Sequence, residues 1–136
     1  MLAIWRLHGL DRILARAWDA GIVLAGTSAG ANCGFEGSTT DSFGPLAALN
    51  DGLGFVRGSH SPHYDSEPGR RPLFQRLISR GTLGDGYASD DAAAIVFRDR
   101  DLVEVVASLP EARGYRVVRV PESEAIETEL PTHYLG

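Results

Sequence analysis

The sequence predicts an α/β fold: a mixed, largely parallel sheet flanked by helices, with a C-terminal antiparallel hairpin. Three observations lead to this prediction. Apolar side chains over residues 10–17 follow helical spacing. Residues 22–25 form a short apolar run, typical of a strand buried on both faces of a parallel sheet. Near the C-terminus, two strand-like segments at 93–97 and 102–106 are joined by a tight connection.

The order of elements can be followed along the first third of the chain. The helix over 10–17 can be capped by Asp11 and stopped by Gly21. The strand over 22–25 comes next, and small residues at 31–33 suit a following helix. A helix leading into a buried strand and then into a second helix is typical of an α/β sheet.

The middle and the end of the chain supply the remaining elements. Residues 36–50 are rich in Gly, Ser, Thr and Asp, and are predicted to form a loop. A brief strand is expected at 54–56, and residues 59–64 suit a strand end that runs into a loop. A helix is predicted over 72–80 and a further strand over 115–120.

Composition and charge exclude several classes of function. The chain has 136 residues, 43% of them hydrophobic, which suits a single domain. Its net charge of -5 gives no electrostatic support for a nucleic-acid or membrane partner. The single cysteine, Cys33, rules out an internal disulfide and a thiolate metal cluster. No signal-peptide pattern or long apolar run is present, so we expect a cytoplasmic protein. We also expect no cofactor and no metal.

The strongest local signal is the pattern Gly26-x-Ser28-x-Gly30 directly after the predicted buried strand. A sharp strand-to-helix turn strains the central residue, requires small neighbours and exposes the hydroxyl of Ser28. The N–H of Ala29 would then serve as an oxyanion donor. A structural glycine-rich turn is the alternative, and we favour the nucleophile because a predicted strand precedes the pattern.

A serine nucleophile needs a base, and a base needs a third group to orient it. His60 and His63 share one predicted loop, and composition alone does not choose between them. Candidates for the third group are Glu36 and Asp41, after the elbow, and Asp65, close to His63. Acids in loops are more often solvated or turn-forming, so these assignments stay open at this point.

Several ordered motifs resemble those of peptidase E, the aspartyl dipeptidase. They are Gly-Thr-Ser-Ala-Gly-Ala-Asn at 26–32, Thr-Thr-Asp at 39–41, Pro-His-Tyr at 62–64 and the segment 86–91. The elbow is also similar to that of the cyanophycinases. The resemblance covers nearly the whole chain, as a single peptidase E-like domain over 1–136. It implies a Ser-His-acid hydrolase on a sheet related to the class I glutamine amidotransferases.

The resemblance also implies roles for individual residues. Ser28 takes the place of the nucleophile and His63 that of the base. Asp41 matches the family's acid because it follows the Thr-Thr pair, and Glu36 is the alternative because some relatives use glutamate. The implied substrates are small peptides, above all dipeptides with an N-terminal aspartate.

Such a substrate needs a cation for its side chain and an acid for its free amine. The candidate cation is Arg70, with Arg57 and Arg71 as alternatives, and the candidate acids are Asp90 and Asp91. All five residues suit an ordinary surface or turn position equally well. The partner we expect is therefore a small peptide, and a homodimer is the assembly we consider.

One departure from the family pattern bears on activity. Family members are longer at the N-terminus and carry a Gly-rich loop that supplies a second oxyanion N–H, and no such segment precedes Gly26. Our hypothesis is an N-terminally truncated member, since losing one donor costs ~2.7–4 kcal/mol of transition-state stabilisation. The alternatives are an impaired or inactive homologue acting as a binding domain, and a cyanophycinase-like or esterase hydrolase.

Overall fold

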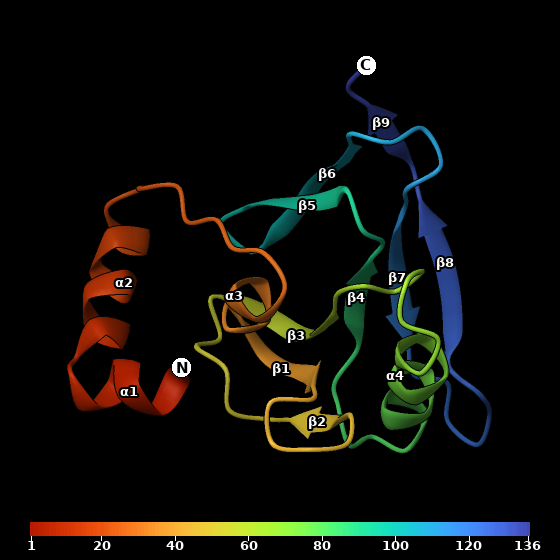
Figure 1. Ribbon diagram of the computed structural model, residues 1–136, viewed down its shortest axis with the longest axis horizontal. Helices are drawn as coiled ribbons and strands as arrows, with labels where there is room; N and C mark the ends of the chain where they lie inside the picture. The colour runs from red at the N-terminus through yellow and green to blue at the C-terminus, as the bar shows by residue number, and fades with distance from the viewer.

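The computed structural model describes residues 1–136 and arranges them in two sheets with four helices (Figure 1). The larger sheet has six strands in the order β2-β1-β3-β4-β7-β8, and the smaller has the order β5-β6-β9. Helices α1 and α2 lie to one side of the sheets, and no helix is both long and apolar enough to cross a membrane. The elements in chain order are α1 (Leu2–Leu7), α2 (Leu10–Asp19), α3 (Ala29–Asn32), β1 (Phe35–Thr40), β2 (Ala47–Leu49), β3 (Val56–Ser61), α4 (Arg70–Ser79), β4 (Gly86–Ser89), β5 (Ala93–Arg98), β6 (Asp101–Ala107), β7 (Gly114–Val118), β8 (Ile126–Leu130) and β9 (Thr132–Tyr134).

Three parallel strands form the centre of the larger sheet. β3 pairs in parallel with β1 on one side and with β4 on the other. Antiparallel strands complete it, with β2 beside β1 and the β7–β8 pair beside β4. This mixed α/β arrangement, with helices against the sheet, confirms the predicted fold class. Because β3 and β4 run in the same direction, the loops that follow them leave the sheet at the same edge.

The core of the larger sheet lies under α4. Phe74 and Ile78 point from this helix into the sheet and are fully buried, and they pack with Val117 of β7 and Leu83. The helix was predicted at 72–80 and begins two residues earlier, at Arg70. Burial of this apolar stripe is the main force that holds α4 against the strands.

The apolar run at 22–25 does not form the predicted buried strand. Neither sheet includes it, and Val23 is 89% exposed. A strand requires a neighbouring backbone to complete its ladder of hydrogen bonds, and no segment of the chain lies in position to do so. The elbow is therefore reached from a segment without regular secondary structure.

The predicted loop at 36–50 contains two strands, β1 and β2, and this prediction was wrong. Ser38 and Thr39 in β1 are 1% and 0% exposed, and the Thr39 hydroxyl lies 2.8 Å from that of Ser61 in β3. The Thr39 and Ser61 hydroxyls satisfy each other between the strands, and backbone pairing in the sheet overrides a composition typical of loops.

The C-terminal half follows the prediction more closely. The hairpin of β5 and β6 is present, and Asp99 in its turn adopts φ 56°. The strand predicted at 115–120 is β7. No clear pattern was found beyond residue 120, and the structure forms β8 on the larger sheet and β9 on the smaller.

The close approach of β3 and β4 gives a test of the sheet. A methyl group at Gly86 would overlap the main chain and hydroxyl of Ser59 and lie 2.7 Å from the Phe74 ring. We expect Gly86→Ala to lower the free energy of unfolding by ~1–3 kcal/mol, the usual cost of overpacking.

The matched control is Gly84→Ala. A methyl group there meets only Gly58, at 3.8 Å, so its free energy of unfolding should stay within ~0.5 kcal/mol of the wild-type value. Urea denaturation of the three proteins measures both effects. Equal stability of the two variants would show that β3 and β4 do not approach in this register.

Candidate active site

The backbone at Ser28 has the strain expected of a nucleophile elbow. Ser28 adopts φ 49° and ψ -120°, a conformation that non-glycine residues rarely take, and α3 begins at the next residue. A methyl group on Gly26 would lie 2.5 Å from the carbonyl carbon of Gly30, so only glycine fits there. Gly30 itself faces open space, so the expected need for a small residue applies to Gly26 and not to Gly30.

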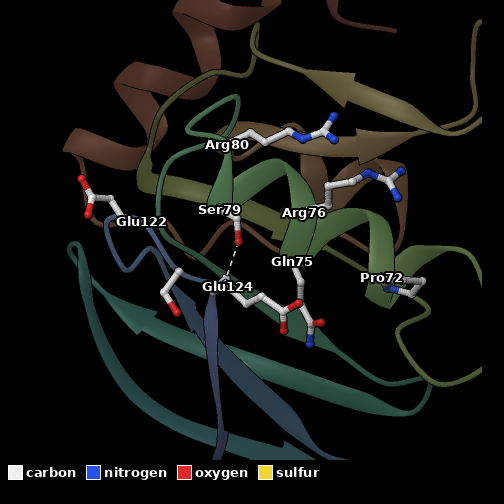
Figure 2. Close-up of a pocket in the computed structure, with 9 residues that line it drawn as sticks. Pro72, Gln75, Arg76, Ser79, Arg80, Glu122 and Glu124 are labelled. Atoms are coloured by element: carbon white, nitrogen blue, oxygen red, sulfur yellow. Dashed lines mark hydrogen bonds between the residues drawn. The ribbon is translucent and has the colours of Figure 1, made fainter.

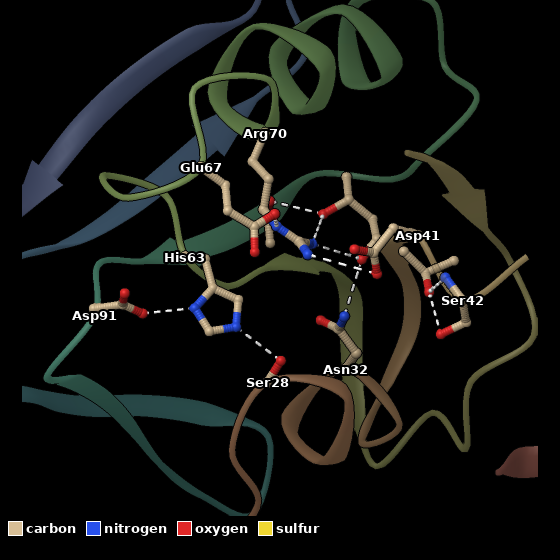
Figure 3. Close-up of polar contacts among 11 residues, drawn as sticks. Ser28, Asn32, Asp41, Ser42, His63, Glu67, Arg70 and Asp91 are labelled. Carbon is tan, nitrogen blue, oxygen red and sulfur yellow. Dashed lines mark hydrogen bonds and ion pairs between the residues drawn. The ribbon is translucent and has the colours of Figure 1, made fainter. Parts of the chain in front are cut away.

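The histidine ring of His63 joins Ser28 to an acid (Figure 3). Its Nε2 lies 2.8 Å from Ser28 Oγ, and its Nδ1 lies 2.6 Å from Asp91 Oδ1. The His63 side chain is 29% exposed and that of Asp91 51%, so the group opens to solvent. A hydroxyl, an imidazole and a carboxylate in this order are the arrangement that activates a serine nucleophile.

Neighbouring parallel strands bring the base and the acid together. His63 follows the end of β3, and Asp91 follows the end of β4. His63 has φ 54°, a left-handed conformation that turns the chain directly after the strand. Since β3 and β4 end at the same edge of the sheet, their following loops place the ring and the carboxylate side by side.

The carboxylate of Asp91 is kept ionised by its surroundings. Hydrogen bonds from Ser66 and from His63 lower the pKa of Asp91 below its ordinary value. The Asp91 backbone is held as well, because its N–H donates to Asp65 Oδ1 at 2.9 Å. Asp65 thus fixes the loop that carries the acid and does not contact the His63 ring in the hydrogen bonds of this structure.

The structure corrects the expected third member of the group. Asp41 Oδ1 lies 3.9 Å from an Nη atom of Arg70, and Glu36 accepts a 2.7 Å hydrogen bond from the Gly58 N–H. Neither carboxylate contacts His63, whose Nδ1 is occupied by Asp91. Asp41 and Glu36 are both wrong as orienting acids because the Thr-Thr-Asp segment ends β1, which lies on the side of β3 away from β4.

The residues predicted to bind substrate are mostly engaged elsewhere. Asp91 belongs to the Ser28 group, and Asp90 is buried and accepts hydrogen bonds from the Arg113 N–H and the Tyr115 hydroxyl. Burial raises the pKa of Asp90. Arg70 is 4% exposed.

Arg70 is held between two acids beside the site. Its Nε donates to Glu67 at 2.6 Å. On the other side of the guanidinium, an Nη atom donates to the Thr39 carbonyl at 3.2 Å, and Asp41 lies farther away at 3.9 Å (Figure 3). Arg71 instead pairs with Glu127, away from Ser28. A substrate carboxylate that bound Arg70 would therefore share this cation with Glu67 and Asp41.

One backbone group of the elbow faces the reacting centre. The Ala29 N–H, at the first residue of α3, has no acceptor within the chain. It therefore remains available to an oxygen bonded to the carbon that Ser28 attacks. Ala29 is the residue that the sequence nominated for this donor role.

A large cavity opens beside Ser28, His63 and Asp91. Its volume is about 990 Å³, and 18 of its 28 lining residues are hydrophobic. Several aromatic side chains line it: Trp18 stacks on Phe55 at 5.4 Å between ring centroids, and Phe97 is also part of the lining. A reactant at Ser28 would thus face mainly apolar surface.

A second hollow of about 760 Å³ lies between α4 and the loop before β8 (Figure 2). Its lining is mostly charged and polar, and it contains no histidine. The one hydroxyl of α4 that faces it, on Ser79, accepts a 2.7 Å hydrogen bond from the Ala125 N–H. No histidine lines this hollow, so the hydroxyl–imidazole pair found at Ser28 is absent from it.

Below the surface group, His60 is buried in a polar cluster. Its Nδ1 lies 2.9 Å from Asn32 Oδ1 and its Nε2 3.3 Å from Ser89 Oγ. Burial, together with the charges of Arg70 and His63, lowers the pKa of His60 to about 3. His60 is therefore neutral at physiological pH. Both of its ring nitrogens contact Asn32 and Ser89, whereas the nitrogen that lies against Ser28 Oγ belongs to His63.

The chain is similar to known peptidases. Residues 1–105 match the model of peptidase family S51. A curated relative from Bacillus subtilis (strain 168), named "Uncharacterized peptidase YgaJ", is 49% identical over 136 residues. The alignment covers 100% of this chain and 58% of the relative, so the chain spans less than two thirds of the length of that protein.

The buried imidazole predicts acid sensitivity. The unfolded chain protonates His60 near the ordinary value of ~6.5, and the folded chain only near pH 3. Between these values the unfolded state binds more protons, so stability is fully present above pH ~6.5 and falls as the pH drops, by at most ~1.4 kcal/mol per pH unit from this group.

Urea denaturation from pH 7 to pH 5 measures this dependence before most carboxylates titrate. We expect a shallower slope in His60→Gln than in the wild type, and an unchanged slope in His8→Gln, which replaces an exposed histidine. Identical slopes in all three proteins would mean that His60 is not held neutral by the fold.

Proposed function

Because the chain belongs to peptidase family S51, we propose that it is a serine-type peptidase that hydrolyses short peptides through an acyl-enzyme on Ser28. One observation carries the proposal: Ser28 Oγ, both ring nitrogens of His63 and Asp91 Oδ1 form an unbroken chain of hydrogen bonds. The activity of the longer relative and its substrates are not assumed for this chain, which spans 58% of that protein.

The geometry supports the usual two-step chemistry of acyl transfer. His63 Nε2 takes the hydroxyl proton while Ser28 Oγ bonds to the peptide carbonyl carbon, and the resulting oxyanion is placed to accept from the Ala29 N–H. Asp91 stabilises the imidazolium through Nδ1–H. The proton then passes from Nε2 to the leaving amine, and water, deprotonated by the same nitrogen, releases the acid and restores Ser28.

We expect Asp91→Asn to reduce the rate of Ser28 modification by a fluorophosphonate, by up to ~10⁴-fold, because the amide no longer supports the imidazolium or fixes the ring's tautomer. Asp41→Asn should stay within about threefold of wild type because Asp41 does not contact His63. Ser28→Ala should abolish labelling.

Labelling is the better readout because it reports the reactivity of the Ser28 hydroxyl directly and requires neither the true substrate nor the deacylation step. Intact-protein mass spectrometry, followed by peptide mapping, gives the site and the rate. The proposed arrangement would be contradicted if Ser28 of the wild type stayed unlabelled. It would also be contradicted if the labelling rate fell as far in Asp41→Asn as in Asp91→Asn.

We further propose dipeptides with an N-terminal aspartate as substrates. The resemblance to peptidase E motifs supports this, and Arg70 is the cation nearest the group in the polar network around Asn32 and Thr39. An Asp-leading dipeptide should be cleaved at least ~10-fold more efficiently than its Asn-leading isostere, because only the carboxylate gains a charge-assisted hydrogen bond.

The apolar lining of the cavity favours a second candidate, hydrolysis of uncharged esters. Measuring kcat/KM for the two dipeptides and for a short p-nitrophenyl ester separates the candidates. Preference for the Asp-leading peptide supports a dipeptidase, and efficient cleavage of the ester with no Asp preference supports an esterase.

A further inference from the structure

Beneath the exposed group lies a second chain of three polar residues, which we call the buried bridge: Asn32, His60 and Ser89. All three residues are buried, with exposed fractions of 7%, 4% and 8%. Each is close in sequence to one residue of the group above. Asn32 follows Ser28 by one helical turn, His60 precedes His63 by three residues, and Ser89 precedes Asp91 by two.

The proton positions in the buried bridge follow from its partners. Asn32 Nδ2 donates to the Thr39 carbonyl at 3.0 Å, so the Asn32 oxygen is the atom that faces His60 and accepts from its Nδ1–H. The Nε2 of His60 is then unprotonated and accepts from the Ser89 hydroxyl. One proton on a neutral ring satisfies both contacts, and no atom of the bridge lacks a partner.

The bridge connects the two parts of the chain that must meet at His63. Asn32 ends α3, the helix that begins directly after Ser28, and is the one buried residue of that helix. Ser89 ends β4, just before the loop with Asp91. Between them, His60 in β3 is held flat against the Phe35 ring, with centroids 4.9 Å apart and planes at 11°. The ring therefore has little freedom to turn.

We propose that the buried bridge is a positioning device: His60 sets the separation between α3 and the end of β4, so that Ser28 and Asp91 reach opposite nitrogens of His63 at the same time. This inference rests on the proposed hydrolase function. His63 is partly exposed and is attached to the sheet through a strained turn, so it cannot fix that separation alone. The contacts that can fix this separation are those of the buried bridge, one layer below.

A purely structural role predicts a different result from a positioning role. Loss of a buried hydrogen bond lowers stability wherever it occurs. Loss of a positioning contact also lowers the reaction rate of the folded protein, because a displacement of ~1 Å at reacting atoms can cost about 10²-fold. The two roles separate when rate and stability are measured in the same variants.

The test uses Asn32→Ala and Ser89→Ala, with Ser59→Ala as the matched control. Ser59 is next to His60 in β3, is fully buried, and donates its hydroxyl proton to the Gly84 carbonyl at 2.6 Å, outside the bridge. Each folded variant is treated with a fluorophosphonate well below its melting temperature. The rate of Ser28 labelling is compared with the melting temperature.

We expect both bridge variants to label about 10- to 100-fold more slowly than the wild type, and Ser59→Ala to label within twofold despite a lower melting temperature. In the double variant the two rate losses should not add, because either change alone breaks the same bridge. Labelling of Ser89→Ala and Asn32→Ala within twofold of wild type would overturn the inference.

A second readout does not depend on reactivity. The proton of the His63 Nδ1–H···Asp91 hydrogen bond should resonate far downfield in the wild type and in Ser59→Ala, and be lost or shifted in both bridge variants. If the wild type is not labelled at Ser28, the hydrolase proposal fails, and this signal still decides the positioning role. An unchanged signal in both bridge variants would overturn it.

Discussion

The hydrogen-bonded link from Ser28 through His63 to Asp91 depends on the parallel pairing of β3 with β4. His63 can hold Ser28 with one nitrogen and Asp91 with the other only if the two strands end at the same edge and at matched heights. The register places His60 opposite Tyr87 and Ser61 opposite Ala88, so the loops that carry His63 and Asp91 begin at nearly the same level. A shift of one residue would turn the flanking side chains to the other face.

The strained backbone at Ser28 and His63 is supported by buried hydrogen bonds beneath it. Ser28 and His63 both have positive φ values, each of which costs of the order of 1–3 kcal/mol unless the surroundings impose it. The buried contacts of Asn32 and His60 lie directly under these turns. The same arrangement lowers the free energy of unfolding in acid, because the His60 ring is held neutral by burial and takes up a proton when the chain unfolds. Precision at the site and acid sensitivity therefore share one cause.

The sequence predicted those parts of the fold and site that rest on local patterns. The elbow, the hairpin of β5 and β6, helix α4 and the candidate pair Ser28 and His63 all have short-range signals, and the structure brings that pair together. The acid was misassigned because β1 and β4 both lie beside β3 and run parallel to it, so the choice between Asp41 and Asp91 depends on which side of β3 the His63 ring faces. That placement is a long-range property, and β4 was not recognised as a strand.

The predictions for β1 and for residues 22–25 failed for a related reason. Ser38 and Thr39 are buried by strand pairing that no local composition reports, while Val23 is apolar and exposed because no strand lies beside it. Hydrophobicity predicts burial only where a partner element exists to provide it. In this chain the tertiary arrangement decides the outcome at both places.

The central claim is that one imidazole connects Ser28 to Asp91. The most direct measurement is a crystal structure of the protein after reaction with a fluorophosphonate. The account predicts phosphorus bonded to Ser28 Oγ, a phosphoryl oxygen accepting from the Ala29 N–H, and His63 Nδ1 still within hydrogen-bond distance of Asp91. An adduct at another residue, or a His63 ring turned toward a different carboxylate, would contradict it.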